Sequence, residues 1–328
     1  MKATHLYIFN SNKIRIIARV LLFNILLIVI LKLIGYGLDN LINAKYALRH
    51  KAKIDGVMDH TLDSDIAIFG SSVAYTHFNP SIISSKVNKT CYNFGLDGTP
   101  LNEYKGILNE FLSYSTAEVI VLAGTYSELA ERTQIYEFKK YEPYLGNENL
   151  YNALSDIDSE LAWKSRYVPF YNLIQYNKDF YDILVETKFD FKLLDHNIAD
   201  AKDYKGFHPV TIDWSNQKYD TIKVEISEKT IINYQEILRK ANSKGIKVIL
   251  VLSPIYIQGQ RHIVNLNQIK DVYKNLAGEE NIFMDFTQSD ICNRKELFRN
   301  NTHLNAKGAN IFSAEFSAKL NKADLIGS

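Results

Sequence analysis

Five short apolar runs constrain the fold of this 328-residue chain more than any other feature. The runs are residues 65–69, 90–93, 118–123, 247–252 and 281–285. They are largely apolar without alternation, as strands buried on both faces of a parallel sheet are. Parallel strands need crossover connections, and stretches of helical periodicity between the runs supply them. The pattern therefore predicts an α/β fold: a doubly wound, three-layer sandwich with about five parallel strands.

Cap residues indicate where several of the helices begin. A polar side chain that accepts hydrogen bonds from the first turn, or a proline in that turn, is typical of a helix start. The predicted starts are Asn79 before Pro80, Pro100, Ser227 and Asn305. The last three helices are expected to end near residues 114, 244 and 320, the second of them at Gly245. In such a sheet, ligands bind at the carboxyl ends of the strands, so functional residues are expected there.

A continuous apolar segment lies near the N-terminus. Residues 20–38 would form about 28 Å of helix, close to the thickness of one bilayer core. Lys13, Arg15 and Arg19 precede it, and positive charge of this kind favours the cytoplasmic side. The segment is therefore predicted to be one transmembrane helix, with residues 1–19 in the cytoplasm and the rest of the chain in the periplasm or at the cell surface.

Two other interpretations of this segment stay open. Basic residues between 45 and 53 follow the segment and weaken the charge asymmetry. A cleaved signal peptide needs small residues at its cleavage site, and residues 43–47 match poorly, so an uncleaved anchor is favoured. The remaining interpretation is a buried core helix in a soluble protein.

Charge and composition narrow the classes of function. The chain has 38 basic and 37 acidic residues and no basic tract, so nucleic acid is not an expected partner. Its histidines lack the paired spacing of metal ligands, and no phosphate loop or dinucleotide fingerprint occurs, so neither a metal nor a cofactor is expected. Cys91 and Cys292 are expected to be buried free thiols, with a single disulfide as the alternative outside the cytoplasm.

The apolar runs also divide the chain into regions. Residues 39–64 are predicted to be a linker and residues 65–328 to form the α/β domain. A long insertion, about 131–225, separates the third run from the fourth and is dense in aromatic residues, which indicates a subdomain or a lid. Most of these rings are expected to pack in a small core of their own. A few are expected to line a sugar-binding groove, with Trp163 and Trp214 as candidates.

A serine and a histidine at opposite ends of the domain are candidates for nucleophilic catalysis. Ser72 follows the first run and Gly70, where a sharp turn would expose its hydroxyl, and His303 precedes the last predicted helix. Acyl transfer through serine needs a hydroxyl, a base within hydrogen-bond reach and donors for the developing oxyanion. The glycine-rich stretch 92–100 follows the second run. The backbone N–H groups of Gly98 and Ser72 are the predicted oxyanion hole.

Three segments in this order resemble the SGNH (GDSL-type) hydrolase superfamily. They are Gly70-Ser71-Ser72, residues 93–98 (Asn-Phe-Gly-Leu-Asp-Gly) and residues 300–309 (Asn-Asn-Thr-His-Leu-Asn-Ala-Lys-Gly-Ala). The likeness extends over about 65–320 and implies the flavodoxin-like fold of that superfamily. It also implies that Ser72 is the nucleophile, Gly98 an oxyanion-hole donor and His303 the general base.

The histidine segment departs from the superfamily at one position. An aspartate usually stands three residues before the histidine, whereas this chain has Asn300. An amide accepts a hydrogen bond from the imidazole N–H but does not offset the charge of an imidazolium. The same exchange lowers kcat about 10⁴-fold in a serine protease, largely through the wrong tautomer. Asn300 is the candidate third member of the site, and a backbone carbonyl, Asp290 or Glu296 is the alternative group that orients His303.

A second departure follows the third apolar run. The superfamily has Gly-x-Asn-Asp there, whereas residues 122–128 contain no asparagine. Losing a side-chain donor from an oxyanion hole typically costs about 2.7–4 kcal/mol of transition-state stabilisation. The hydroxyl of Thr125 or Tyr126 is a candidate replacement, and Tyr126 is also a candidate contact for substrate.

The anchored N-terminus and the His-Leu-Asn-x-x-Gly-Ala ending most resemble membrane-attached members of the superfamily that acylate surface polymers. Examples are alginate O-acetylation proteins and the D-alanine transfer protein of teichoic acids. The likeness implies an extracytoplasmic serine esterase or O-acyltransferase that acts on a polysaccharide with acetyl ester chemistry, beside a membrane-bound acyltransferase. Two alternatives stay open. A catalytically impaired member would bind glycan or assist assembly, and a lipase would use the same residues on lipid esters.

Overall fold

A computed structural model describes residues 11–45, 50–168, 170–175, 181, 185, 204–212, 214–215 and 220–323. The chain forms two compact units. The first, called here the helical unit, comprises Met1–Ala47 and Trp163–His196, and the second, the α/β unit, comprises Leu48–Ala162 and Asn197–Ser328. All five predicted strands belong to the α/β unit.

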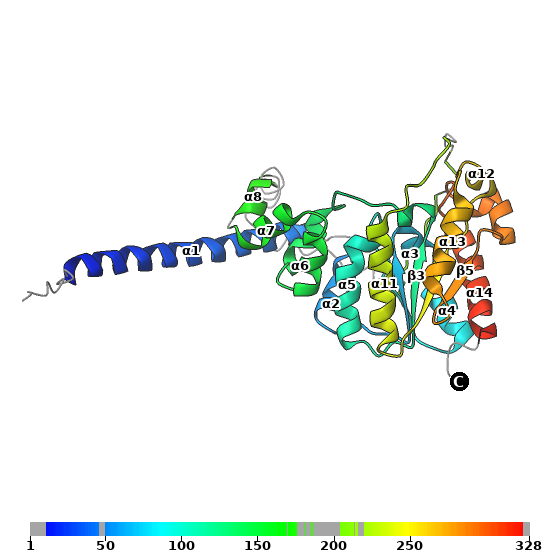
Figure 1. Ribbon diagram of the computed structural model, residues 1–328, viewed down its shortest axis with the longest axis horizontal. Coiled ribbons are helices and arrows are strands. Elements are labelled where there is room, and N and C mark those ends of the chain that lie inside the picture. Colours follow the sequence, from blue (N-terminus) through cyan, green and yellow to red (C-terminus); the bar gives the residue numbers. More distant parts are fainter. Residues whose placement is uncertain are drawn as a thin grey trace, which may run out of the picture. The chain divides into compact units, whose positions relative to one another are not determined.

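The α/β unit is built on a sheet of five parallel strands in the order β2-β1-β3-β4-β5 (Figure 1). The strands are β1 (Ile66–Gly70), β2 (Cys91–Asn93), β3 (Val119–Gly124), β4 (Lys247–Leu252) and β5 (Ile282–Asp285). Every predicted strand is confirmed, with ends that agree to within one residue. β1 and β3 are buried along their whole length because each has a strand on both sides and helices on both faces.

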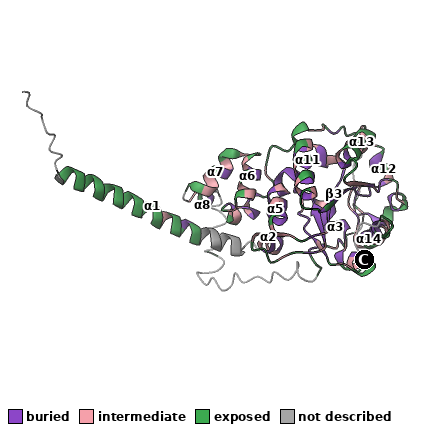
Figure 2. Cartoon of the chain, turned by 60° about the horizontal axis from the view of Figure 1, so that its bottom comes forward, coloured by how far each residue is buried: buried purple, intermediate pink, exposed green. Residues whose placement is uncertain are grey.

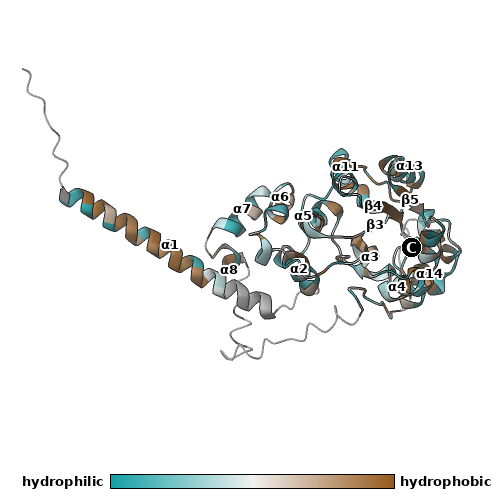
Figure 3. Cartoon of the chain, turned by 90° about the horizontal axis from the view of Figure 1, so that it is seen from below, coloured by the Kyte–Doolittle hydropathy of each residue, from teal (hydrophilic) through white to brown (hydrophobic). Residues whose placement is uncertain are grey.

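Helices cover both faces of the sheet, which confirms the predicted three-layer sandwich (Figure 3). One side carries α2 (Lys51–Met58), α5 (Leu101–Tyr114), α11 (Glu228–Asn242) and α13 (Leu266–Ala277), and the other carries α3 (Ser72–His77), α4 (Pro80–Val87) and α14 (Ala306–Lys322). Side chains alternate between the two faces of a strand. Ala67 and Phe69 of β1 accordingly lie in the core with α5 and α11, whereas Ile66 and Ile68 lie in the core with α14.

Shorter helices occupy the connections. In chain order they are η1 (Tyr126–Leu129), η2 (Phe138–Lys140), η3 (Glu142–Tyr144), α6 (Glu148–Ser155), α7 (Ser159–Tyr167), α8 (Tyr171–Gln175), α12 (Ile257–Gln260), η5 (Asp290–Asn293) and η6 (Lys295–Leu297). Within the described part of the predicted insertion, the helices lie between Phe138 and Gln175, and residues 131–137, 204–212 and 220–225 form no helix. Trp163–His196 of the insertion falls in the helical unit, and the rest of the insertion belongs to the α/β unit.

Three of the four predicted helix starts have a side-chain cap hydrogen bond, and the fourth helix, α5, begins directly after Pro100 without one. The side chain of Asn79 accepts from the N–H of Ser81, that of Ser227 from Thr230 and that of Asn305 from Gly308. These bonds pair N–H groups of the first turn that have no partner within the helix. α11 ends at Asn242, two residues before the predicted end, and Gly245 then adopts a φ of 76° in the turn to β4.

Helix α1 (Ser11–Lys45) of the helical unit contains an apolar segment, Asn12–Gly37, that is long enough to cross a membrane. Most of its residues are exposed (Figure 2), which argues against a core helix. Asn24 interrupts the apolar run, and its side-chain N–H donates to the carbonyl of Val20 at 2.7 Å, so its polar group is partly paired within the helix. The helix fits either a membrane span or a signal sequence.

Helix α2 lies inside the predicted linker, yet it packs in the core of the α/β unit. Its Lys53 is only 2% exposed and donates from Nζ to the carbonyl of Gly95 at 2.6 Å. The neighbouring His50 accepts from the backbone N–H of Asp97 at 3.0 Å. Two side chains of this segment therefore hold the glycine-rich loop that follows β2.

Both cysteines are buried free thiols, as predicted. Cys91 lies in β2, and burial raises the pKa of its thiol well above the ordinary value. Cys292 lies in η5, where burial raises the thiol pKa to about 11. Neither thiol is therefore ionised at neutral pH, and neither has the character of a nucleophile.

Candidate active site

The strand order places Ser72 at the point where the sheet reverses its direction of winding. In doubly wound sheets of order 2-1-3-4-5, ligands bind in the crevice between the carboxyl ends of β1 and β3. Ser72 follows the end of β1 directly, and Thr125 follows the end of β3. Gly70 and Ala123 are opposite each other in the paired strands. The serine and the threonine therefore flank the same crevice.

Gly70 makes the turn from β1 into α3. Its φ is 148°, a conformation that residues with a Cβ rarely adopt. A Cβ at this position would also lie only 2.1 Å from the carbonyl oxygen of Ala123. Glycine is therefore required both for the backbone conformation and for the close approach to β3, and the turn it makes leads directly to Ser72.

The structure brings Ser72 and His303 together across 231 positions of sequence. Ser72 Oγ lies 2.7 Å from His303 Nε2, within hydrogen-bond distance, and both side chains are half-buried. His303 stands in a tight loop before α14, in which its carbonyl accepts from the N–H of Arg299 at 2.9 Å. The next residue, Leu304, forms a β-bridge with Phe298 that closes the loop.

Asn300 orients the imidazole of His303. Its Oδ1 lies 3.0 Å from His303 Nδ1 and also accepts from the backbone N–H groups of Thr302 at 3.0 Å and His303 at 2.8 Å. An acceptor beside Nδ1 keeps the proton on that nitrogen and leaves Nε2 free to accept from Ser72. The hydrogen-bond partners therefore assign the tautomer that a general base needs, although the amide carries no charge.

The two carboxylates considered from sequence as alternatives to Asn300 do not orient the histidine. Glu296 is exposed and pairs with Arg294 at 2.9 Å, and Asp290 is exposed at the start of η5. Both stand close to His303 in sequence, but the loop turns their side chains to solvent. Thr302 Oγ1, 3.1 Å from His303 Nδ1, is the other group beside that nitrogen.

The electrostatic environment keeps His303 neutral. Burial and, to a smaller extent, the charge of Arg299 lower the pKa of His303 to about 4, although the carboxylate of Asp97 acts in the opposite direction. The imidazole is therefore unprotonated at neutral pH and available to take a proton. The positive charge that His303 would carry during catalysis is stabilised by the carboxylate of Asp97, because the residue beside Nδ1 is an amide and not a carboxylate.

The glycine-rich block lies against the helix that begins at Ser72. The N–H of Leu96 donates to the carbonyl of Gly70 at 2.9 Å. The buried side chain of Asn93 donates to the carbonyls of Ala74 and Phe78 at 2.6 and 2.9 Å and fastens the block to α3. Gly98 has a φ of 67°. No described residue accepts from the N–H of Gly98 or of Ser72, so both donors are unused.

The third block supplies a hydroxyl at the same edge of the sheet. Thr125 Oγ1 is buried and has no hydrogen-bond partner among the described residues. Tyr126 is half-buried and packs against the core beside α5 and α11, where burial raises the pKa of its phenol. Of the two hydroxyls considered from sequence, that of Thr125 is the one that is buried without a hydrogen-bond partner among the described residues.

One side chain that supports the site, His77, was not predicted from the sequence. His77 is fully buried at the end of α3, and its Nε2 accepts from the backbone N–H of Leu304 at 3.0 Å. Its ring centroid lies 6.2 Å from that of His303. Burial holds the pKa of His77 well below its ordinary value, so the ring stays neutral and accepts. A lone histidine in an apolar helix gives no signal of this role.

Removing the acceptor at His77 is expected to destabilise the loop that carries His303. In His77→Leu the buried N–H of Leu304 loses its partner, which typically costs about 1–3 kcal/mol of unfolding free energy. His77→Gln, which offers a carbonyl oxygen near the position of Nε2, is expected to lose less. Urea unfolding of both variants measures the difference. Equal losses in the two variants would contradict the assigned hydrogen bond.

The aromatic candidates in the insertion have different surroundings. Trp214 is half-buried, with its ring centroid 5.0 Å from that of Tyr256 and with Lys295 Nζ 4.7 Å above it. The next residue donates its N–H to the carbonyl of Arg299 at 2.8 Å, so Trp214 lies beside the loop of His303. Trp163 is exposed and belongs to the helical unit.

A tyrosine outside the predicted set lies against the glycine block. A Cβ at Gly98 would be 2.5 Å from the ring of Tyr136, which is 42% exposed. The N–H of Tyr136 donates to the buried carboxyl of Glu103 at 3.1 Å, and Lys140 Nζ lies 4.8 Å from the ring centroid. The density of aromatic residues in the insertion indicates that some rings lie near the site, but it does not identify Tyr136 as one of them.

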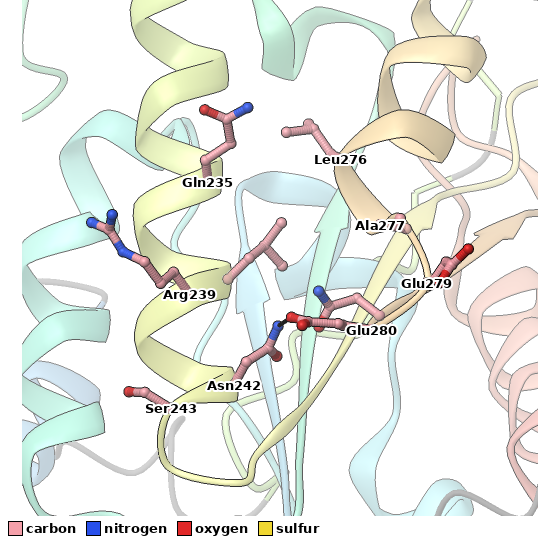
Figure 4. Close-up of a pocket in the computed structure, with 11 residues that line it drawn as sticks. Gln235, Arg239, Asn242, Ser243, Leu276, Ala277, Glu279 and Glu280 are labelled. Carbon is pink, nitrogen blue, oxygen red and sulfur yellow. Dashed lines mark hydrogen bonds between the residues drawn. The ribbon is translucent and has the colours of Figure 1, made fainter.

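Two further features lie outside the site. The described residues include no cluster of three or more His, Cys, Asp or Glu side chains that fits a metal ion. A groove of about 630 Å³ is lined by the C-terminal ends of α11 and α13, including Arg239, Asn242 and Glu280 (Figure 4). These helices end just before β4 and β5 begin, so the groove is at the opposite edge of the sheet from Ser72.

Comparisons with known proteins return distant likenesses. No family model matches the chain, and no curated protein matches it. Similar solved structures include a proposed lipolytic protein of the G-D-S-L family from Desulfitobacterium hafniense DCB-2, with 10% identity, a TM-score of 0.38 and coverage of 77% of this chain and 97% of that one.

A second similar structure is a proposed platelet activating factor from Streptococcus pneumonia, with 12% identity, a TM-score of 0.40 and coverage of 87% of this chain and 95% of that one. A third is a family two carbohydrate esterase from Clostridium thermocellum in complex with cellohexaose, with 10% identity, a TM-score of 0.35 and coverage of 79% of this chain and 64% of that one. All three TM-scores are below 0.5. The function proposed for this chain therefore depends on the geometry of its own site.

Proposed function

We propose that the protein is a membrane-anchored, extracytoplasmic serine esterase or O-acyltransferase that acts on acetyl esters of a cell-surface polysaccharide. One observation supports the chemistry above all others: Ser72 Oγ lies 2.7 Å from His303 Nε2 while Asn300 Oδ1 faces the other imidazole nitrogen at 3.0 Å. A nucleophile, its base and a group that orients the base are the parts that acyl transfer through serine requires.

The proposed reaction proceeds through an acyl-serine. Ser72 Oγ attacks the ester carbonyl carbon, and its proton passes to His303 Nε2. The negative oxygen of the tetrahedral intermediate is bound by the unused N–H groups of Ser72 and Gly98, with the hydroxyl of Thr125 as the side-chain donor. The intermediate collapses, and the leaving alkoxide takes the proton from His303. Water or a sugar hydroxyl then attacks the acyl-serine with the same proton transfers in reverse order.

Asn300, the neutral third member of the site, limits the rate of acyl transfer. Proton transfer is most efficient when the pKa of the base is near the working pH, and the pKa of His303 is about 4. A hydrogen bond from an imidazolium to a neutral amide is also weaker than one to a carboxylate. We therefore expect turnover of activated acyl donors to be easier to observe than turnover of stable esters.

The proposed membrane location of the protein and its proposed polysaccharide substrate are supported by different observations. The segment Asn12–Gly37 is apolar over its length, and the basic residues Lys13, Arg15 and Arg19 cluster at its N-terminal end. The resemblance to membrane-attached proteins that acylate surface polymers supports a polysaccharide substrate. A membrane-bound acyltransferase is the partner that this resemblance suggests as the source of acyl groups.

Trapping the acyl-enzyme tests the proposed chemistry. The full-length protein in detergent micelles is mixed with p-nitrophenyl acetate, quenched with acid and analysed by intact-mass spectrometry and peptide mapping. We expect one acetyl group on Ser72, no adduct in Ser72→Ala, and an unchanged adduct in the control Ser243→Ala, whose exposed serine lies at the opposite edge of the sheet. Turnover that does not depend on Ser72, or no turnover at all, would contradict the proposal.

A further inference from the structure

Ser71, the residue before the candidate nucleophile, is engaged in an unusual way. It precedes α3 in the N-cap position, where a serine hydroxyl normally accepts a hydrogen bond from an N–H of the first turn. The Ser71 side chain makes no such bond. Its hydroxyl instead donates to the carboxyl oxygen Oε1 of Glu128 in η1. Both side chains are buried, Ser71 at 7% and Glu128 at 5% exposure.

This hydrogen bond joins the two sides of the crevice. Ser71 belongs to the turn between β1 and α3, and Glu128 belongs to the segment that follows β3. The side chain of Glu128 packs on the end of β3, since a Cβ at Gly124 would lie 2.8 Å from Glu128 Cγ. The contact therefore fixes the turn that carries Ser72 relative to the neighbouring strand, at the carboxyl edge where the site lies.

Burying the carboxyl group of Glu128 in these surroundings lowers the stability of the fold. Tyr104, Tyr234 and Tyr273 are almost fully buried around it and each interacts electrostatically with the carboxyl. Burial raises the pKa of Glu128 to about 7, although the bond from Ser71 and the charge of Arg132 act in the opposite direction. An apolar side chain of similar size would stabilise such a site more than a carboxyl does. The carboxyl is therefore best explained by the bond it accepts.

We propose that Glu128 is a positioning residue, which receives the Ser71 hydroxyl and thereby holds the Ser71–Ser72 peptide in the geometry that acyl transfer needs. The peptide carries the N–H of Ser72, and the Cα that follows this nitrogen bears the side chain with the reacting hydroxyl. Without the acceptor, the Ser71 hydroxyl is free to rotate toward the first turn of α3, as an ordinary cap does. The two serines then have different roles: Ser72 reacts with substrate, and Ser71 is held by Glu128. This inference builds on the proposed function.

A double-mutant cycle tests whether Ser71 and Glu128 act as one unit. Ser71→Ala, Glu128→Ala and the double variant are compared with wild type for hydrolysis of p-nitrophenyl acetate by the full-length protein. Each single variant is expected to lower kcat by about tenfold with KM changed by less than about twofold, the effect of one lost hydrogen bond in the transition state. The double variant is expected to lose no more than the worse single variant.

Glu128→Gln is the conservative variant that separates positioning from packing. It keeps an acceptor oxygen at the position of Oε1 and is expected to restore kcat to within about twofold of wild type. Losses that multiply in the double variant would overturn the proposal, as would a kcat for Glu128→Gln as low as that of Glu128→Ala. If Glu128→Ala does not fold, the comparison of Ser71→Ala with Glu128→Gln still decides the question.

Hydrogen exchange of the backbone amides provides a readout that does not need turnover. Glu128→Ala and Ser71→Ala are expected to speed exchange at residues 71–75 by about tenfold, and Glu128→Gln to leave it unchanged. Glu103→Ala is the matched control, because Glu103 is an equally buried carboxyl with a raised pKa of about 7, and it is expected to leave exchange at 71–75 as in wild type. Unchanged exchange in Glu128→Ala would overturn the positioning role, whereas absent turnover in wild type would contradict the proposed function alone.

Discussion

Replacing His303 with alanine is expected to lower kcat for p-nitrophenyl acetate about 10³-fold, the usual size of a general-base contribution. The imidazole is the group 2.7 Å from Ser72 Oγ, and its loss leaves the serine hydroxyl with its ordinary, very high pKa. The remaining rate would come from the oxyanion donors and from substrate binding. Steady-state kinetics on the full-length protein in detergent measure the loss.

His60→Ala is the control for this variant. His60 also pairs with a side-chain acceptor, Glu110, at 2.7 Å, and its ring stacks on that of Tyr114 with the centroids 4.3 Å apart. Its removal is expected to leave kcat within about twofold of wild type, because it touches none of the reacting groups. A His303→Ala protein that keeps most of its activity would show that another base serves Ser72.

Replacing Asn300 with aspartate is expected to raise kcat about tenfold. A charged acceptor on Nδ1 gives a hydrogen bond stronger than a neutral one by about 1–1.5 kcal/mol, and about 1.4 kcal/mol corresponds to tenfold in rate. Because Oδ1 of Asn300 is already 3.0 Å from Nδ1, the substitution adds charge without changing the geometry. Asn300→Ala, which removes the acceptor, is expected to lower kcat instead.

The same substitution is expected to move the acid limb of the pH profile. His303 acts as a base only when neutral, so wild-type kcat should fall as pH drops through about 4. A neighbouring carboxylate raises the pKa of an imidazole, so the fall in Asn300→Asp is expected at a higher pH. The control is Asn305→Asp, which adds the same charge at the N-cap of α14 without facing Nδ1. A limb that stays near pH 4 in Asn300→Asp, or a gain equal to that of Asn305→Asp, would contradict the role of Asn300.

The sheet and the serine–histidine pair follow from local sequence signals. A run such as residues 65–69 is apolar without alternation, which both faces of a buried strand require, and that requirement does not depend on distant residues. Gly70 and Asn305 likewise mark a sharp turn and a helix start by their own backbone and hydrogen-bonding properties. These local signals identify Ser72 and His303 separately, and the tertiary structure brings Ser72 Oγ to 2.7 Å from His303 Nε2.

The groups that support the pair depend on tertiary contacts that sequence spacing does not reveal. His77 and Glu128 act on backbone or side-chain groups 227 and 57 positions away. In sequence they look like ordinary residues of short helices. The third member was ambiguous for a different reason: Asp290 and Glu296 offered the right charge near His303, but the loop geometry selects Asn300, because an amide oxygen can satisfy two backbone N–H groups as well as the imidazole.

Helix α2, which follows the apolar N-terminal segment, limits where the α/β unit can be separated from that segment. Lys53 and His50 hold the backbone of Gly95 and Asp97, so the glycine block depends on chain that precedes the first strand. A soluble form that begins before His50 keeps these contacts, whereas one cut after Met58 loses both. The side of α2 on which the chain is cut therefore decides whether the glycine-rich loop keeps its support.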